Sequence, residues 1–390
     1  MAPRQDNAGE ERVVFAAGEA SGDLLASLVL PALRAQHPQL LCAGIAGDRM
    51  IAAGCEPWFH VRELSVRGYA EVLRHLPRLL RLRRRFIERV QAWPASLYVG
   101  VDAPDFNLGV AARLRATGLR TVQYVSPAIW AWRPGRIEKI RAAVDQMLCI
   151  FPFEQAIFER AGLRASYVGH PLARTIPRTP DAAAARARLG LAVDRPTVAL
   201  LPGSRRAEVA SLGGPFLQAA ALLAQRERAL QFVLPVADPA LDPIIDQQMQ
   251  GAGLDGSTVL RVPGRSHDAL EAADVVVVAG GTATLEAMLF KRPMVIAYKV
   301  PPLTEWITLR QAVIPYFGLP NVLEGRYTVP ELLQEAVEPQ RIAAAVLRYL
   351  ERPAEVRALR ERFERQHEAL LRDTPALTAQ AIADLLPGRQ

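Results

Sequence analysis

Short apolar runs alternate with longer amphipathic stretches along most of the chain. In the first half, the apolar runs fall at 12–17, 40–47, 96–104, 121–127, 146–153 and 165–171. Most of them are followed by a turn and a stretch with helical periodicity. Short buried strands that alternate with helices of about 10–15 residues are typical of a parallel sheet covered on both faces. The first half therefore predicts a doubly wound α/β domain.

The same alternation starts again after a proline-containing break at 171–180. Further apolar runs follow at 196–204, 231–238, 258–264, 273–281 and 292–300, and from about Pro339 the chain is helical, amphipathic and charged. We read the break as a linker between domains. The pattern predicts two doubly wound α/β domains that face a cleft, over 1–173 and 174–345, followed by helices over 346–390.

The composition excludes two classes of protein. Half of the residues are apolar and 22% are charged, which is too apolar for a disordered chain. Three cysteines, Cys42, Cys55 and Cys149, cannot form a disulfide framework, and their spacing matches no zinc motif. The N-terminal segment has no apolar core of a signal peptide, and no stretch reaches about 18 uninterrupted apolar residues. We expect a cytoplasmic protein without a membrane span.

The positive charge is concentrated in one segment. The net charge is +7, and residues 74–89 contain seven arginines and one glutamate. We expect a surface helix that starts near Pro77. On its helical wheel, one face carries Arg78, Arg81, Arg85 and Arg89, and the opposite side carries Leu76, Leu79, Leu80, Phe86, Ile87 and Val90. Such a face is either solvated or in contact with an anionic membrane, where each arginine adds about 1 kcal/mol. A patch this confined disfavours nucleic-acid binding.

Ligands of doubly wound sheets bind beyond the carboxyl ends of the strands, so the turns there are the candidate sites. In the second half, one glycine turn opens a helix whose N-terminus suits a phosphate, with a carboxylate one turn later that can reach a ribose. A second turn offers glycine, serine and an arginine fork for phosphate oxygens. The alternative is two ordinary turns with Thr282 as a helix cap. The candidate donor-site residues are Gly203, Ser204, Arg205, Gly280, Gly281, Thr282, Ala283, Thr284 and Glu286.

In the first half, carboxylates follow two of the predicted strands, in 18–23 and 101–107. Asp102 and Asp105 flank a proline, and a carboxylate held in this way can act as a general base on a hydroxyl. Asp105 and Asn107 could instead cap the helix that follows, and we favour capping for Asp105.

Aromatic residues follow another predicted strand. Trp130, Trp132 and Arg133 come after Ser126 and could border a sugar or acyl pocket, or could simply belong to the core. His170 lies at the domain junction, where it could contact substrate. No HExxH, paired-aspartate or EF-hand pattern occurs, so we expect no metal and no cofactor.

A series of short motifs occurs in order along the chain, namely GEASGD (18–23), GIAGDRM, VDAPDFN (101–107), YVSPAIWAWR (124–133), FPFE, GHPL, LLPGSR (200–205), GTATLE (281–286), PMVIAYK and GLPN (318–321). Each is weak alone, but the ordered set resembles the lipid A disaccharide synthase family from about Val13 to the tail. The resemblance implies the GT-B fold, two Rossmann-like domains with C-terminal helices that cross back. It also implies a metal-independent, inverting transfer from UDP-2,3-diacylglucosamine to lipid X, which is 2,3-diacylglucosamine 1-phosphate.

The resemblance assigns roles to the candidate residues. Asp102 would be the general base, with Glu19 as the next candidate. Arg205 and the helix N-terminus at Gly281–Thr282 would stabilise the leaving diphosphate. Glu286 would hold the ribose, and Asn321 would line the donor site. The expected acceptor-side residues are Ser21, Asp105, Asn107, Ser126, Trp130, Trp132, Arg133 and His170.

Both substrates are acylated, so the resemblance implies a peripheral protein on the cytoplasmic face of the inner membrane of a Gram-negative bacterium, and a possible homodimer. The basic helix is the expected docking element. The chain departs from the family pattern at Gly280, where serine is common, and at Arg67, where an apolar residue is usual. It also departs at Val313, where a basic residue is expected, and Arg310 would have to supply that charge. Two alternatives stay open: a UDP-sugar epimerase of the same fold, or a non-enzymatic UDP-sugar-binding protein at a membrane surface.

Overall fold

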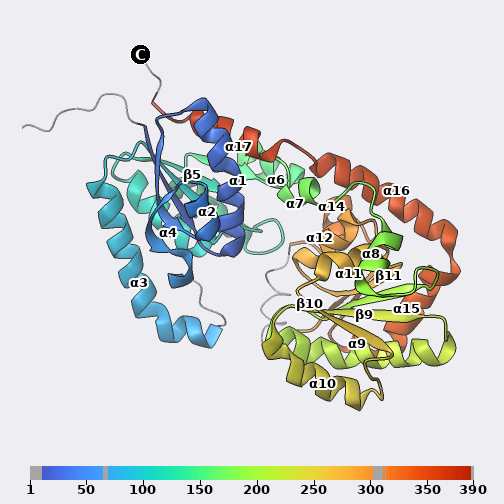
Figure 1. Cartoon of the computed structure of the whole chain (residues 1–390). Helices are drawn as coiled ribbons and strands as arrows, with labels where there is room; N and C mark the ends of the chain where they lie inside the picture. Colours follow the sequence, from blue (N-terminus) through green and yellow to red (C-terminus); the bar gives the residue numbers. More distant parts are fainter. Residues whose placement is uncertain (1–10, 65–68, 302–310, 312, 388–390) are drawn as a thin grey trace, which may run out of the picture. The chain divides into compact units, whose positions relative to one another are not determined.

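The computed structural model describes residues 11–64, 69–301, 311 and 313–387 (Figure 1). It divides into two compact units: the N-terminal unit, residues 1–171 with 370–390, and the C-terminal unit, residues 172–369. The first division lies two residues before the predicted boundary at 173. The predicted helical tail, 346–390, is shared between the units, because only its last part, from Leu370 onward, belongs to the N-terminal unit.

The N-terminal unit is built on a parallel sheet with the strand order β3-β2-β1-β4-β5-β6-β7. Its strands are β1 (Arg12–Ala17), β2 (Leu41–Ala46), β3 (Glu56–His60), β4 (Leu97–Val101), β5 (Arg120–Tyr124), β6 (Gln146–Cys149) and β7 (Arg164–Tyr167). The central strands β1 and β4 are almost wholly buried. Their continuous apolar sequences are the ones expected of strands covered on both faces.

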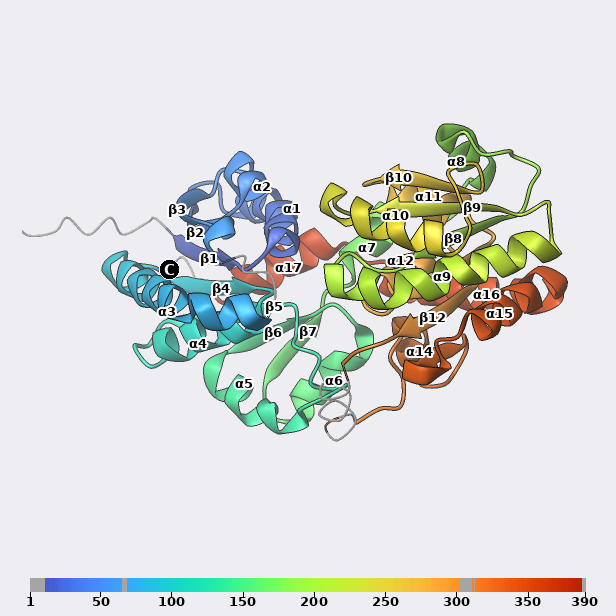
Figure 2. The same ribbon diagram turned by 90° about the horizontal axis from the view of Figure 1, so that it is seen from below.

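Helices cover both faces of this sheet. They are α1 (Ala20–Gln36), α2 (Asp48–Ala52), α3 (Tyr69–Ala92), α4 (Pro104–Arg115), α5 (Ile137–Ala143), α6 (Pro152–Arg160) and α17 (Thr374–Ala383), with short 3₁₀ turns at Val61–Glu63 and Pro134–Arg136. One apolar cluster joins α1 and α17 to the sheet, and the other joins α3, α4, α5 and α6 to its opposite face. Helix α17, close to the end of the sequence, thus packs beside α1, which is the first helix of the chain (Figures 1 and 2).

The C-terminal unit repeats this architecture with the strand order β10-β9-β8-β11-β12-β13, again with all strands parallel. Its strands are β8 (Thr197–Leu201), β9 (Gln231–Val236), β10 (Val259–Pro263), β11 (Val275–Ala279), β12 (Met294–Tyr298) and β13 (Glu331–Leu333). The helices are α7 (Pro171–Thr175), which starts at the last residue before the division, α8 (Ala182–Leu189), α9 (Arg206–Arg226), α10 (Asp242–Gly251), α11 (Ser266–Ala272), α12 (Thr282–Leu289), α14 (Leu319–Glu324), α15 (Pro339–Glu351) and α16 (Pro353–Leu370), with 3₁₀ turns at Pro239–Leu241 and Gln334–Ala336.

Helix α9 is the one described helix that is long and apolar enough, by length and composition alone, to cross a membrane. Its buried side, which includes Leu212, Phe216 and Leu223, faces the core, and it packs against α15 and the sheet. It also contains Pro215 and two glycines. These contacts are those of a core helix in a doubly wound unit.

The structure adds two strands that the sequence pattern did not predict, β3 and β13. Both lie at a sheet edge. β3 contains Pro57 and is only partly buried, and β13 has three half-buried residues. Proline and short length are typical of edge strands, which lack the apolar run of a central strand.

The prediction for the basic helix needs two corrections. Helix α3 begins at Tyr69, so Pro77 lies inside it rather than in its first turn. The buried side consists of Leu82, Phe86, Ile87 and Val90, whereas Leu76 and Leu80 are 42% and 45% exposed. The helix therefore presents two leucines to solvent, which the wheel had placed with the buried residues.

Candidate functional site

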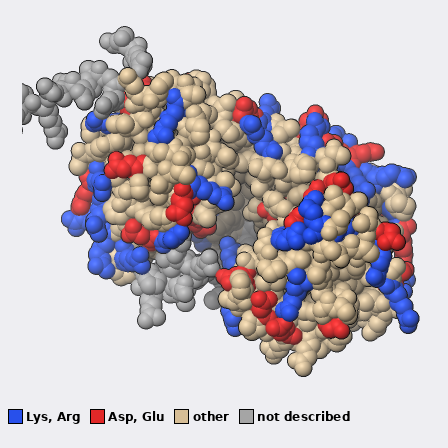
Figure 3. Space-filling model, viewed as in Figure 1, with Lys and Arg blue, Asp and Glu red and all other residues tan. Residues whose placement is uncertain are grey.

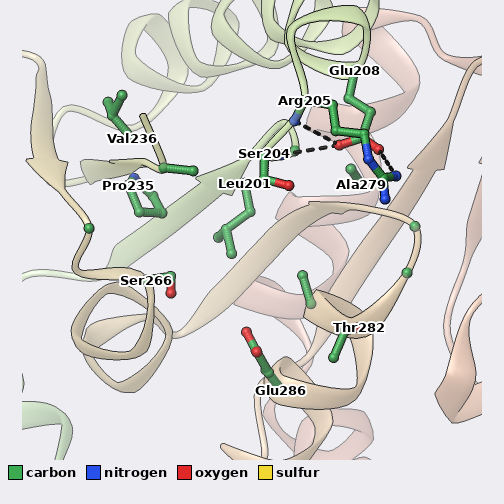
Figure 4. Close-up of a pocket in the computed structure, with 16 residues that line it drawn as sticks. Leu201, Ser204, Arg205, Glu208, Pro235, Val236, Ser266, Ala279, Thr282 and Glu286 are labelled. Atoms are coloured by element: carbon green, nitrogen blue, oxygen red, sulfur yellow. Dashed lines mark hydrogen bonds and ion pairs between the residues drawn. The ribbon is translucent and has the colours of Figure 1, made fainter. Parts of the chain in front are cut away.

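A cavity of about 510 Å³ opens in the C-terminal unit at the carboxyl ends of β8, β9, β10 and β11 (Figure 4). Turns after four neighbouring parallel strands meet there, as expected for a doubly wound sheet. It is lined by Leu201, Gly203, Ser204, Arg205, Glu208, Pro235, Val236, Ala237, Gly264, Ser266, Ala279, Gly280, Gly281, Thr282, Ala283 and Glu286. The structure thus brings together the two turns singled out in the sequence.

The turn after β8 is held by Glu208, a residue that the sequence analysis did not select. Its carboxylate accepts hydrogen bonds from the backbone N–H groups of Ser204, at 3.1 Å, and Arg205, at 3.2 Å, and from Nη1 of Arg205 at 3.0 Å (Figure 4). Gly203 has φ +117°, and a Cβ there would lie 2.4 Å from Glu208 Oε2. Only glycine fits this turn, which presents the Arg205 guanidinium to the cavity rim.

The turn after β11 leads directly into α12. Gly281 has φ +92°, and nothing lies within 4 Å of where its Cβ would be, so the backbone borders open space. The first N–H groups of α12, at Thr282 and Ala283, have no partner one turn earlier within the helix. They border the cavity together with the side chain of Glu286 (Figure 4).

Glu286 has a basic neighbour, His267. The distance from His267 Nε2 to Glu286 Oε1 is 3.7 Å, and the ring packs edge-on against Phe290. Pairing with Glu286 raises the pKa of His267 above its ordinary value. The carboxylate that faces the cavity therefore lies beside a histidine that takes up a proton more readily than usual.

Two predicted donor-site residues do not line the cavity. Thr284 is fully buried, and its Oγ1 donates to Gly281 O and accepts from Leu319 N. Asn321 is also fully buried, donating to Val329 O and Glu331 and accepting from the N–H groups of Thr328 and Val329.

The sequence analysis also missed half of the cavity wall. The turns after β9 and β10 contribute the apolar segment 235–237, together with Gly264 and Ser266. The turn after β9 carries no glycine or arginine to distinguish it. The turn after β10 contains Gly264 and Arg265, a signal that could have singled it out.

In the N-terminal unit, Asp102 occupies a strained turn at the carboxyl end of β4. Asp102 and Ala103 have φ +57° and +39°, a region that costs a non-glycine residue roughly 1–3 kcal/mol. Asn107 Nδ2 and Gln123 Nε2 donate to Asp102 O at 2.8 and 3.0 Å and hold the turn. Strain kept in place by buried amides is typical of a functional position.

The Asp102 carboxylate itself is bound at both oxygens. Ser21 Oγ donates to Oδ2 at 2.8 Å, and the Ala103 N–H donates to Oδ1 at 2.8 Å. The two predicted loops also approach closely, since a Cβ on Gly18 would lie 2.0 Å from that of Ala103. The structure therefore joins Ser21 and Asp102, which the sequence placed separately.

The other carboxylates of these loops differ in setting. Glu19 is exposed and precedes α1 without a side-chain cap. Asp23 is buried and accepts from the N–H groups of Gly47, Arg49 and Met50 at the start of α2. Asp23 thus supports the fold, whereas the Glu19 carboxylate has no hydrogen bond or ion pair with any residue that the structure describes.

Two expectations for the following helix are wrong. Asp105 does not cap α4, because Ala103 is the cap residue and Asp105 forms an exposed ion pair with Arg136 at 2.6 Å. Asn107 is fully buried, and its amide is used by Tyr98 and the backbone of β1 and β4, so it is placed to support the turn rather than to touch an acceptor.

Beyond β5 and β6, Ser126 and Trp130 converge on a buried carboxylate, Glu154. Ser126 Oγ and Trp130 Nε1 donate to Glu154 Oε1 at 2.5 and 3.0 Å, and the N–H groups of Ile150 and Phe151 donate to Oε2. Burial raises the pKa of Glu154 despite these donors. Ser126 and Trp130 therefore organise the loop, and Glu154 is a residue of this region that the sequence analysis did not select.

The remaining aromatic candidates divide into exposed and buried. Trp132 is 37% exposed, and the Arg133 guanidinium lies 4.3 Å from its ring centroid, so this pair is open to solvent. Trp130 packs edge-on against Phe153 at 5.1 Å. His170 is buried, and its ring centroid lies 5.3 Å from that of Phe151. Burial lowers the pKa of His170 to about 4.

His170 makes the protein acid-sensitive in a way that can be measured. Its folded pKa of about 4 lies below the ordinary 6.5, so the unfolded state binds the proton more readily and stability falls as pH drops below about 6.5. Between pH 7.5 and 5 this amounts to about 2 kcal/mol. We expect His170→Gln to flatten the fall of Tm over this range by a few degrees.

A histidine with the opposite shift provides the control for this prediction. The pKa of His267 is raised, so that its stabilisation is present at low pH and lost as pH rises. His267→Gln should therefore steepen the acid side of the profile or leave it unchanged. Equal slopes for wild type and His170→Gln would contradict the assignment.

The four arginines of the basic face are all exposed on α3, and basic side chains gather over this helix at the lower left of Figure 3. They differ in their neighbours. Arg85 lies over Phe59 and Arg89 over Trp58, at 5.7 and 4.9 Å, and Arg89 is 3.7 Å from Glu56. Arg78 and Arg81, nearer the exposed leucines, have no ion pair among the described residues.

Among the described residues, no group of three or more His, Cys, Asp or Glu side chains is placed to hold a metal ion. Of the departures from the family pattern, Arg67 and Arg310 lie outside the described residues, and Val313 is 55% exposed. Gly280 lines the cavity, and a Cβ there would meet Tyr298 at 3.0 Å, so a small side chain is accommodated only if that ring gives way.

Comparison with known proteins decides the family. A family model described as lipid-A-disaccharide synthetase matches residues 13–383. The chain belongs to the lipid-A-disaccharide synthase family. The matched residues include both the cavity of the C-terminal unit and the strained turn of the N-terminal unit.

Curated relatives agree over nearly the full length. The chain is 47% identical to the lipid-A-disaccharide synthase of Paraburkholderia phytofirmans over 384 residues, 97% of each chain. It is 45% identical to that of Xanthomonas campestris pv. campestris over 381 residues, 97% of this chain and 87% of the relative. The chain is therefore an enzyme, a glycosyltransferase, and its family does not favour the epimerase or the non-enzymatic alternative.

Solved structures confirm the GT-B fold at low sequence identity. The S. aureus MnaA structure with UDP superposes with a TM-score of 0.65 at 10% identity, covering 97% of this chain and 99% of that one. Acinetobacter baumannii MurG gives 0.56 at 12% identity, with coverages of 96% and 99%. A UDP-GlcNAc 2-epimerase from Neisseria meningitidis and a glycosyltransferase from Rickettsia africae both superpose with a TM-score of 0.59, so the fold alone does not choose between these activities.

Proposed function

We propose that this member of the family transfers 2,3-diacylglucosamine from UDP to the 6-hydroxyl of lipid X, giving a β-1,6-linked tetraacyl disaccharide 1-phosphate and UDP. The observation that carries the proposal is the cavity at the carboxyl ends of β8–β11. Two glycine turns, an arginine and a carboxylate face it, which is the set that a nucleoside diphosphate needs.

In this proposal, the C-terminal unit binds the UDP portion of the donor. The diphosphate lies against the N–H groups of Thr282 and Ala283 and the guanidinium of Arg205. Glu286 accepts hydrogen bonds from the ribose hydroxyls. The apolar segment 235–237 provides a surface for the uracil ring.

The reaction is a single displacement. The Asp102 carboxylate takes the proton from the acceptor 6-hydroxyl, and the oxygen forms a bond to the anomeric carbon of the donor. The bond from that carbon to the diphosphate breaks on the opposite face, so the configuration inverts and UDP leaves with the electron pair. Arg205 and the α12 N-terminus stabilise the charge that develops on the diphosphate. Ser21 orients Asp102 through its 2.8 Å hydrogen bond, and Glu19 is the rival base.

On the acceptor side, the exposed Trp132–Arg133 pair is the part of the predicted set best placed to meet a ligand, with the ring for an apolar portion and the guanidinium for the 1-phosphate. The other predicted residues have supporting roles. Loops of this unit are held in place by the hydrogen bonds of Ser126, Trp130 and Asn107 and by the packing of His170 against Phe151. Asp105 is held at the surface by Arg136.

The product distinguishes the proposal from its alternatives. Incubation of donor and acceptor lipids should yield a lipid of the mass of the tetraacyl disaccharide 1-phosphate. An epimerase would instead convert the donor in the absence of acceptor, and a binding protein would leave both lipids unchanged.

We further propose that the enzyme docks peripherally on the cytoplasmic face of the inner membrane through residues 76–81 of α3. Arg78 and Arg81 lie in the same turns of α3 as Leu76 and Leu80, on another side of the helix, and the exposed fractions of the two leucines are 42% and 45%. A helix with arginines on one side and exposed leucines on another suits the interface of an anionic leaflet, with the charges at the headgroups and the leucines towards the acyl chains. A homodimer is proposed from the family resemblance alone.

Charge reversal on α3 tests the docking surface. We expect Arg78→Glu/Arg81→Glu to weaken binding to vesicles containing phosphatidylglycerol by at least about tenfold at low salt, since each arginine contributes about 1 kcal/mol. The matched control is Arg228→Glu/Arg365→Glu, which changes the net charge equally on exposed positions of the C-terminal unit. Equal weakening by both pairs would show a general charge effect and would contradict docking through α3.

A further inference from the structure

A second cavity in the C-terminal unit lies at the opposite end of the sheet from the donor cavity. Its volume is about 370 Å³, and it borders Pro196 and Val275, at the amino ends of β8 and β11. The donor cavity borders the carboxyl ends of the same strands. Strands of five residues separate the two by about 17 Å. The remaining walls come from α8, α15 and the first turns of α16.

Arginines dominate the polar lining of this cavity. Arg186, Arg357 and Arg360 line it together with two carboxylates, Asp194 and Asp274. Asp274 is already committed, because its Oδ2 accepts from Arg186 Nη2 at 2.6 Å and from Thr197 N at 2.8 Å. Asp194 is exposed at the rim. Arg357 and Arg360 have no ion pair among the described residues, so the lining carries excess positive charge.

A further arginine lies behind the lining. Arg292 is 6% exposed and donates to the carbonyl oxygens of Leu270, at 3.1 Å, and Glu271, at 2.6 Å. These partners are neutral and do not balance its charge. Burial lowers the pKa of Arg292 to about 10. The nearby positive charges of Arg360 and Arg186 act in the same direction, and the carboxylates of Asp274 and Glu271 act against them. The arginines of this cluster therefore repel one another, and Asp274 and Glu271 offset only part of that repulsion.

Arg360 is also incompletely satisfied. Its Nε is buried and has no hydrogen-bond partner among the described residues. A buried donor without a partner is unfavourable, and a guanidinium fork matches the oxygens of a phosphate in geometry and charge. An anion bound by the guanidinium groups that line the cavity would reduce the repulsion among the arginines.

We propose that this cavity binds a phosphate group, with Arg357 and Arg360 as its guanidinium partners. A volume of about 370 Å³ suits one or two phosphate groups with water, and the lining shares no residue with the donor cavity or with the proposed acceptor residues of the N-terminal unit. The group can be carried by a free inorganic anion or by a lipid headgroup. The proposal does not depend on the proposed reaction.

The test compares the Tm of the full chain with and without pyrophosphate at constant ionic strength. The variants are wild type, Arg360→Gln and the control Arg365→Gln, which changes an exposed arginine of the same helix. Because a ligand that binds only the folded state stabilises it, we expect Tm to rise by a few degrees in wild type and the control, and by clearly less in Arg360→Gln. Pyrophosphate bound in the donor cavity would raise the Tm of all three proteins equally. The test is therefore the difference between the rise in Arg360→Gln and the rise in the other two proteins.

The anion-free buffer gives an independent readout. There, Arg360→Gln should be as stable as wild type or more stable, because it removes a repulsive charge and an unpartnered donor. An equal rise of Tm with pyrophosphate in all three proteins would overturn the proposal. A Tm of Arg360→Gln below that of wild type in both buffers would also overturn it, because it would show that Arg360 has a packing role. A parallel arm with phosphatidic acid vesicles identifies the source: binding that depends on Arg360 only in this arm assigns the phosphate to a lipid, and dependence only with pyrophosphate assigns it to a free anion.

Discussion

Replacement of Asp102 by asparagine is expected to lower the rate of sugar transfer by about 10²–10⁴-fold, the usual contribution of a positioned general base. The variant should fold, because asparagine tolerates the left-handed backbone of this position, where φ is +57°. Its amide can still meet Ser21, but it cannot take the acceptor proton. The measurement is the transfer rate at saturating donor and acceptor, alongside the affinity for UDP.

Two variants serve as controls for Asp102. Asp105→Asn removes a carboxylate three residues away that is paired with Arg136 at the surface, and it should leave the rate nearly unchanged. Glu19→Gln tests the rival base. UDP affinity should be unchanged in all three, since none of them lines the donor cavity. Full activity of Asp102→Asn combined with loss in Glu19→Gln would transfer the role of base to Glu19.

Replacement of Arg205 by alanine is expected to cost about 10²–10³-fold in rate, the scale seen when one preorganised donor to a developing negative charge is lost. The structure adds a second reason. Without Arg205, Glu208 keeps its two backbone hydrogen bonds but loses its cation and presents an unbalanced carboxylate at the cavity. The loss should appear mainly in kcat, because the interaction strengthens as the diphosphate leaves.

The neighbouring arginine is the matched control for Arg205. Arg206 begins α9, is exposed and does not line the cavity. Arg206→Ala should therefore retain nearly full activity, and Arg205→Lys should recover part of the loss because it restores charge without the guanidinium fork. Equal effects of alanine at both positions would show that overall charge, and not the placement of Arg205, matters.

Much of the fold could be predicted from the sequence, because the central strands are continuous apolar runs followed by turns. The run 275–279 is buried on both faces, and its short length and four valines favour a strand over a helix. The edge strands β3 and β13 escaped because half-exposed residues leave no apolar run. The helices over 346–390 were assigned as one group for a similar reason. Amphipathic periodicity shows that α15, α16 and α17 bury a face, but not against which unit.

The candidate site was predictable in position and less so in detail. The turns around Arg205 and Gly281 carry glycines whose φ values require them, and the sequence shows those glycines directly. Asn321 and Asn107 look the same in sequence as residues that bind a ligand. Their full burial and their bonds to backbone groups emerge only from long-range packing. The hydrogen bond between Ser21 and Asp102 joins residues 81 positions apart, which no local pattern encodes.

The most direct test of the account is UDP release from UDP-2,3-diacylglucosamine, measured with and without lipid X, in detergent and with EDTA. We predict release that requires lipid X, persists in EDTA and falls in parallel with the formation of the tetraacyl disaccharide in Asp102→Asn and Arg205→Ala. Folded enzyme that releases no UDP with both lipids present, or that releases UDP equally without lipid X, would contradict the proposed transfer.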